Sequence, residues 1–331
     1  MQRRDRTFFA LMAAGAAALA LLPLIGVDAS FRHFLILAFI YAIVASNWDL
    51  TLGYGGILNF AHPAFFALGV YGYAIFASTL EVEPWLALLL AGGVAVIAAL
   101  MIVLPVLRLR GIYVILVTFA FGQICLQIVL SQSQITGGSQ GMVLLPGLQL
   151  GDWSFARDGR MGYYYATLLL LVLSTIYLRM VVRSSFGRSI QALRDNEYYA
   201  ISRGISVSRQ RILTMAASAV FTGMAGGMYA AYLRVASPEV FGLDFLIIVL
   251  SALLLGGTST ILGPVMAAIL LAILSEWMMD LGAWRFLILS VLIVGVLRFY
   301  PGGLYALIEG LAKWAISGRA AVRRGARSPL K

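Results

Sequence analysis

The chain has 331 residues, of which 61% are hydrophobic and only 11% are charged, and it carries a net charge of +10. Soluble globular proteins carry about 25% charged residues, so this composition excludes an ordinary soluble domain and predicts a polytopic membrane protein. The single cysteine, Cys125, excludes an internal disulfide framework. Because there are only two histidines besides it, we expect no metal site in this chain.

Uncharged apolar runs predict about ten membrane-spanning helices. A hydrocarbon core about 30 Å thick needs about 20 helical residues, and charges or turn residues mark where each run ends. We therefore expect an all-α fold with a single transmembrane domain over residues 1–331. The predicted spans are residues 8–27, 34–52, 57–78, 85–107, 112–131, 162–178, 212–233, 245–262, 265–281 and 286–300.

The basic residues lie mainly on one side of these predicted spans. Ten spans place both termini on the same side, and that side holds 19 of the 24 lysines and arginines, including a basic tail over residues 313–331. By the positive-inside rule, this side is cytoplasmic. The net charge is therefore a signal of orientation and of contact with lipid headgroups, and we expect no nucleic-acid partner.

Two glycine-rich breaks interrupt the predicted spans: residues 53–56, and a second break formed by Gly256, Gly257, Gly263 and Pro264. Interrupted spans expose backbone polar groups and often line the path of a transporter, although both breaks also suit plain hairpin turns. Asp49 lies inside a span, where it needs a hydrogen-bonding partner or a wet cavity. His62 fits either a direct transport role or a hydrogen-bonded helix start. The candidate pathway residues are Asp49, Gly53, Gly55, Gly56, Asn59, His62, Gly256 and Gly257.

Two long loops separate the spans. The outer loop, residues 132–161, is rich in Gly and Gln. The cytoplasmic loop, residues 179–211, predicts two short helices at residues 188–194 and 197–203, with Asp195 or Asn196 as a cap and Gly204 as a stop. Such helices form either a docking surface for a partner protein or an interfacial pair that extends its arginines into headgroups.

A stripe of small residues follows the cytoplasmic loop. Ala219, Gly223, Gly227 and Ala231 recur every four residues in one predicted span, which permits close contact with another helix. This stripe serves either ordinary packing or the transmission of movement from the loop to the membrane.

Glu197, Ala200 and Gly204 form an E-x-x-A-x-x-x-G pattern that resembles the coupling motif of ABC-importer permeases. The blocks "LGYGGILNFAHPAFFALGVYGY", "TGGSQG", "LLGGTSTILGP" and "RFYPGGLYAL" are similar, in the same order, to those of the branched-chain amino-acid permease family of LivM type. The stretch from Asn59 to His62 looks more like the sister LivH type. The resemblance implies a type II-like importer permease fold of about ten helices, and it implies that ATPase coupling involves Arg188, Arg194, Glu197, Ala200 and Gly204.

The resemblance also implies partners: a second homologous permease, two cytoplasmic ATPase subunits and a periplasmic solute-binding protein, all at a bacterial inner membrane. No G-x-x-x-x-G-K-[ST] motif occurs, so we expect ATP and Mg to be bound by the partner subunits and this chain not to be an enzyme. The expected substrate is a branched-chain or other amino acid. Urea, short amides and small aromatic or carboxylic acids remain alternatives, as does a secondary ion-coupled transporter.

Overall fold

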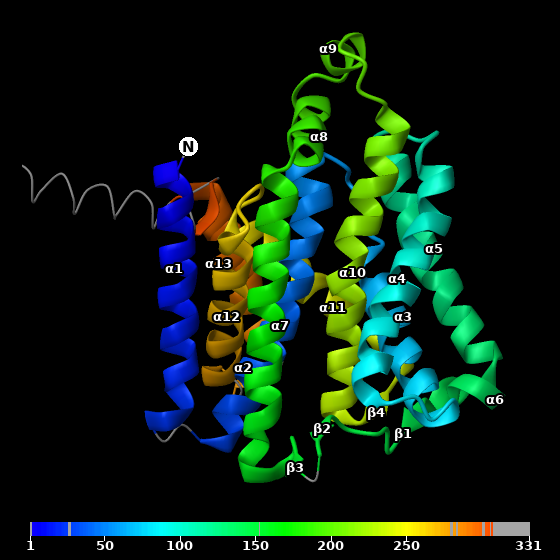
Figure 1. Ribbon diagram of the computed structural model, residues 1–331, viewed down its shortest axis with the longest axis vertical. Coiled ribbons are helices and arrows are strands. Elements are labelled where there is room, and N and C mark those ends of the chain that lie inside the picture. Colours follow the sequence, from blue (N-terminus) through cyan, green and yellow to red (C-terminus); the bar gives the residue numbers. More distant parts are fainter. Residues whose placement is uncertain are drawn as a thin grey trace, which may run out of the picture.

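The computed structural model describes residues 2–25, 28–151, 153–278, 281–282, 284–299, 302–304 and 306. Long helices lie side by side in a bundle (Figure 1). Two short helices, α8 (Ser185–Asp195) and α9 (Glu197–Ser202), project from one end. Short strands close the other end. We call these the α8–α9 end and the strand end of the molecule. The predicted basic tail, residues 313–331, lies outside the described residues.

Each of the ten predicted spans overlaps one helix of the bundle. Five of these helices are long and apolar enough to cross a membrane within the described residues, and α1, α11 and α12 contain shorter apolar stretches. The chain is therefore a mostly helical, multi-pass membrane protein, whereas the count of ten crossings stays a prediction. The bundle helices are α1 (Gln2–Leu21), α2 (Ala29–Asp49), α3 (His62–Ala74), α4 (Pro84–Val106), α5 (Ile112–Ser131), α7 (Arg157–Arg183), α10 (Val207–Leu233), α11 (Leu243–Gly256), α12 (Leu262–Trp277) and α13 (Trp284–Phe299).

The strand end departs from the all-α expectation. Two antiparallel pairs of two-residue strands form there, β1 with β4 and β2 with β3. Strands this short leave no alternating pattern for sequence reasoning to detect. The predicted outer loop is also shorter than expected, because α7 already begins at Arg157. The elements of this end are α6 (Ser133–Thr136), β1 (Met142–Val143), β2 (Gln149–Leu150), β3 (Trp153–Ser154) and β4 (Val235–Ala236).

The region between α2 and α3 also differs from the prediction. Helix α2 continues into a π-helical turn, Leu50–Tyr54, but residues 55–61 are not helical. Helix α3 begins only at His62, with Pro63 in its first turn, where the missing proline N–H is tolerated. Irregular backbone survives at membrane depth only when protein encloses it, and Asn59 and Ala61 are fully buried.

Helix α2 is the centre of the packing. Residues Ala42 to Asp49 are buried on every side of the helix, as expected of a helix surrounded by other helices. Its neighbours are α7, α10, α11 and α12. Helix α10 packs against α3 and α4 as well, so α2 and α10 together connect most of the bundle.

Small residues allow α10 to approach α3 and α4 closely. The predicted stripe, Ala219, Gly223, Gly227 and Ala231, is buried along its whole length. A Cβ added to Gly223 would lie 2.6 Å from the Ala91 carbonyl oxygen of α4. The backbone of Gly223 also lies directly against Gly69 of α3. Close backbone contact of this kind is how small residues hold membrane helices together.

We predict that Gly223→Ala lowers the free energy of unfolding by about 1–3 kcal/mol, because the added methyl overfills the contact with α4. The matched control is Gly93→Ala on the exposed side of α4, where a Cβ meets nothing within 4 Å. That variant should be neutral or slightly stabilising, since alanine favours helix. Thermal unfolding of the purified chain in detergent measures both, and equal midpoints would contradict the packing assignment.

Candidate functional site

The loop at the α8–α9 end folds as two capped helices. Helix α8 starts where the Ser184 side chain accepts a hydrogen bond from the Gly187 N–H at 3.1 Å. Helix α9 starts where the Asn196 side chain accepts from the Tyr199 N–H at 2.9 Å. The cap between the two helices is thus Asn196 rather than Asp195. After α9 the chain turns at Gly204, whose φ of +80° is a left-handed conformation suited to glycine.

Helix α9 presents exposed aromatic and apolar side chains to solvent. Tyr198 is 82% exposed, Tyr199 58% and Ile201 47%. Contiguous apolar groups on a surface often mark a site of protein interaction. Arg203 stacks over Tyr199 and donates to its hydroxyl at 2.8 Å, which holds that ring in place. The sequence analysis did not single out Tyr198, Tyr199 or Ile201, although two adjacent tyrosines in a basic loop could have indicated an interaction surface.

The motif residues Glu197 and Ala200 face the bundle instead. Ala200 is buried, and Glu197 forms ion pairs with Arg110 at 3.1 Å and with Arg211 at 3.7 Å. These contacts tie α9 to the α4–α5 turn and to the start of α10. They border a cavity of about 370 Å³ on the membrane side of α8 and α9, whose lining also includes Ile57, Leu58, Val114, Leu193, Gln210 and Thr214.

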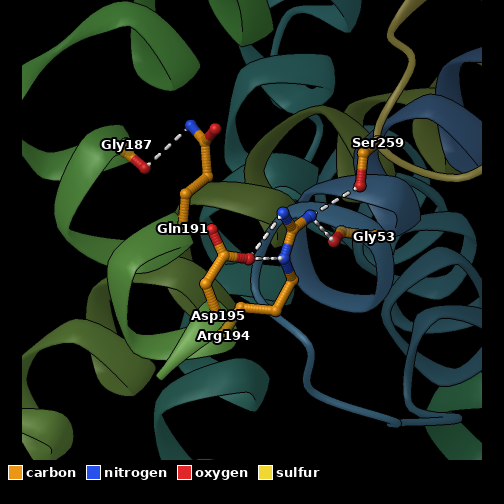
Figure 2. A network of polar contacts seen from close by, with 6 residues as sticks. All are labelled: Gly53, Gly187, Gln191, Arg194, Asp195 and Ser259. Carbon is orange, nitrogen blue, oxygen red and sulfur yellow. Dashed lines mark hydrogen bonds and ion pairs between the residues drawn. The ribbon is translucent and has the colours of Figure 1, made fainter. Parts of the chain in front are cut away.

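Arg194, at the end of α8, connects this loop to both glycine breaks (Figure 2). Its Nη1 donates to the Gly53 carbonyl oxygen at 2.8 Å and to the Ser259 hydroxyl at 2.8 Å. Its Nε and Nη2 donate to the Asp195 carboxylate, both at 2.9 Å. These two hydrogen bonds orient the guanidinium. One side chain therefore contacts the end of α2 and the turn between α11 and α12, which are about 200 residues apart in the chain.

Asp49 joins the same two segments from within the bundle. Its two carboxylate oxygens accept hydrogen bonds from the Ser259 N–H at 2.8 Å and the Thr260 N–H at 3.0 Å. The side chain is completely buried. The partner that a buried acid requires is thus the backbone of the α11–α12 turn, where Asp49 has a structural hydrogen-bonding role.

The glycines of the two breaks allow this close assembly. A Cβ at Gly56 would lie 2.7 Å from Cγ of Arg194, and Gly56 has a φ of +64°. Gly256 lies against the backbone of Gly263, and Gly257 has a φ of +98°. Larger residues would separate the segments that Arg194 and Asp49 join.

Asn59 and His62 are fully buried and contact α2 through Trp48. The Trp48 indole donates to the Asn59 carbonyl oxygen at 2.8 Å, and the His62 ring stacks on Trp48 with centroids 5.4 Å apart. Asn59 Oδ1 and His62 Nδ1 are 3.2 Å apart. His62 therefore starts α3 inside a buried cluster.

The structure thus brings part of the predicted site together. Asp49, Gly53, Gly56 and Arg194 lie around the α11–α12 turn that follows Gly256 and Gly257. Arg188 is separate, because its guanidinium donates to the Arg183 carbonyl oxygen at 2.8 Å. Gly204 also stands apart, since a Cβ added there would meet nothing within 4 Å. The class this geometry defines is a multi-pass membrane protein whose water-exposed helical loop is hydrogen-bonded to the breaks of its spanning helices.

Comparison with known proteins is consistent with this class. A family model described as the permease component of branched-chain amino acid transport systems matches residues 30–298. The chain is 32% identical over 289 residues to the high-affinity branched-chain amino acid transport system permease protein LivM of Escherichia coli strain K12, covering 81% of this chain and 68% of that protein. The LivM protein of Salmonella typhimurium strain LT2 is 32% identical over 286 residues, covering 80% and 67%.

The sister protein LivH of Escherichia coli strain K12 is 25% identical over 281 residues, covering 77% of this chain and 89% of LivH. No solved structure matches the chain significantly. The chain belongs to the branched-chain amino acid permease family, which confirms the resemblance inferred from its sequence blocks. Members of this family are permease components of transport systems, so the chain is not itself an enzyme.

We predict that Asp49→Ala lowers the free energy of unfolding by about 1–3 kcal/mol, because two N–H groups of the α11–α12 turn lose their acceptor. Asp49→Asn should cost less, since its amide oxygen still accepts one of the two bonds. The matched control is Asp195→Ala, which removes an exposed carboxylate paired with Arg194 and should change stability by less than about 1 kcal/mol. Chemical denaturation in detergent measures all three, and equal losses for Asp49→Ala and Asp195→Ala would contradict the capping role.

Proposed function

We propose that this chain is a membrane subunit of an ATP-driven importer, in which ATPase subunits dock on α8 and α9 and drive movement of the spanning helices. The observation that carries the proposal is the bonding of Arg194. It joins the end of the exposed helix α8 to both glycine breaks, so a displacement of α8 acts directly on the ends of α2 and α11. Packed elements linked in this way transmit movement because they are not continuously deformable.

The docking surface fits a protein partner better than a layer of headgroups. Tyr198, Tyr199 and Ile201 project from α9, while the acidic Glu197 is held inward by two arginines. An interfacial helix would instead place its apolar side toward the bundle and the lipid. The partner ATPase subunits would bind ATP and Mg, since this chain carries no phosphate-binding loop.

The family membership supports the transported class. Relatives named as branched-chain amino acid permeases favour a branched-chain or similar amino acid, delivered by a periplasmic solute-binding protein and moved into the cytoplasm. The similarity to both LivM and LivH favours pairing with a second, homologous permease. In this assembly the fold is type II-like with ten spans, in a bacterial inner membrane, with the α8–α9 end and both termini on the cytoplasmic side.

We predict that Gly204→Trp abolishes solute uptake and the ATPase activity that depends on it, because a bulky side chain on the docking surface obstructs the partner. The matched control is Gly204→Ala. Both variants carry the same backbone strain of about 1–2 kcal/mol for a left-handed residue, but only tryptophan adds bulk to the open space around Gly204. Uptake and ATPase activity are measured in vesicles with the complete importer. Normal uptake by Gly204→Trp would contradict the assignment of α9 to the docking surface.

We also predict that Arg194→Ala lowers uptake by about tenfold or more, the factor expected when a charge-assisted hydrogen bond is lost. ATPase binding should persist, because the Arg194 guanidinium is bonded to Gly53 and Ser259 and the substitution leaves the exposed side chains of α9 unchanged. Ser189→Ala is the control on the same helix, since within the described residues the Ser189 hydroxyl bonds only the Ser185 carbonyl oxygen of α8. Copurification of the ATPase and solute uptake are measured for both variants. Equal uptake by the two would refute the transmission role of Arg194.

A further inference from the structure

Helix α5 forms an edge of the bundle (Figure 1), and it carries an unusual exposed face. Its exposed side chains recur every three or four residues and so line one side of the helix. We call this set the α5 face: Ile112, Tyr113, Leu116, Ala120, Gln123, Ile124, Gln127, Ile128 and Ser131. It lies on the side of α5 opposite the buried residues Thr118, Cys125 and Val129.

Two residues of the α5 face do not suit contact with lipid. Gln123 lies about 17 Å from the first residue of α5, at a rise of about 1.5 Å per residue, which is near the middle of a helix of 20 residues. Gln127 is one turn further along. Within the part of the chain that the structure describes, neither amide makes a hydrogen bond. Hydrocarbon cannot supply the donors and acceptors that these groups need.

Helix α4, the neighbour of α5, shows what a lipid-facing surface of this protein looks like. Its exposed side chains contain no polar group: they are Leu86, Leu89, Leu90, Ile97, Leu100, Met101 and Leu104. The amides on α5 are therefore a local feature and not a general tolerance of polar groups on the outside of the bundle.

The polar character of the α5 face continues beyond the helix at the strand end. Toward the strand end, exposed Gln132, Ser133 and Gln134 follow Ser131. Toward the α8–α9 end, the α5 face is instead formed by exposed Ile112, Tyr113 and Leu116. The polar groups of the α5 face therefore run from the middle of the helix, at Gln123, to the strand end.

We propose that the α5 face is one wall of a water-filled solute pathway, with Gln123 and Gln127 as the polar groups that a passing solute contacts near the middle of the membrane. This inference rests on the proposed transport function and places its pathway outside the buried Asn59–His62 cluster. Uncharged amides both donate and accept, so they can contact the carboxylate and the ammonium group of an amino acid. They hold neither as strongly as a charge would, which conduction along a path requires.

Thiol accessibility tests the proposal in the complete importer reconstituted into membranes. The parent carries Cys125→Ala, which removes the one native thiol. Gln123→Cys and Gln127→Cys are then introduced singly, with Ile97→Cys on α4 as the control at similar depth. The probe is a membrane-impermeant, cationic methanethiosulfonate. We expect both glutamine positions to react about 100-fold faster than Ile97→Cys, since a cation is excluded from hydrocarbon by about that factor, and we expect added transported solute to slow the reaction.

Two outcomes would overturn the proposal. One is labelling at both glutamine positions as slow as at Ile97→Cys. The other is a cross-link from these positions to a partner permease without aqueous labelling, which would show a dry interface. Uptake by the natural chain in the same membranes tests the transport function independently. If uptake is present while both thiols stay unreactive, the pathway inference alone fails; if uptake is absent, the proposed function fails.

Discussion

Backbone amides and carbonyls that leave a helix inside a membrane must find partners within the protein, and this constraint organises the molecule. The chain leaves helical conformation after Tyr54 and again after Gly256. At the first break, the Trp48 indole reaches the Asn59 carbonyl. At the second break, the Asp49 carboxylate accepts hydrogen bonds from two backbone N–H groups of the turn. Consecutive residues of α2, in the half of the helix that is buried on every side, thus support both irregular segments.

The guanidinium of Arg194 completes this arrangement from the water-exposed side. It donates a hydrogen bond to the Gly53 carbonyl oxygen in the π-helical turn and another to the Ser259 hydroxyl in the second break. The exposed loop is thereby bonded to the backbone at the two places where helical hydrogen bonding is interrupted. Such places are the least costly to move, because fewer regular bonds must break. Stability and the proposed transmission of movement therefore depend on the same few contacts.

Hydropathy alone predicted where the bundle helices lie, because a run of about 20 apolar residues has few other possible structures. The two loop helices followed from capping residues and from Gly204. The non-helical course of residues 55–61 did not, since a short apolar run reads equally well as helix. The partners of Asp49 and Arg194 were also beyond sequence reasoning. They depend on a contact between segments about 200 residues apart, and a single chain without its relatives contains no pairing signal for such a contact.

The lengths of α7 and α10 have a consequence for the site of docking. Each has 27 residues and so extends about 40 Å, which exceeds the hydrocarbon thickness of about 30 Å. The two helices therefore exceed the hydrocarbon by about 10 Å, and their length is within the roughly 40–45 Å of a whole bilayer with its headgroups. Helices α8 and α9 lie beyond the end of α7 (Figure 1). In the proposed assembly, a protein bound at Tyr198 and Tyr199 would therefore act at a distance from the hydrocarbon, where a small tilt of α7 and α10 becomes a larger displacement at their ends.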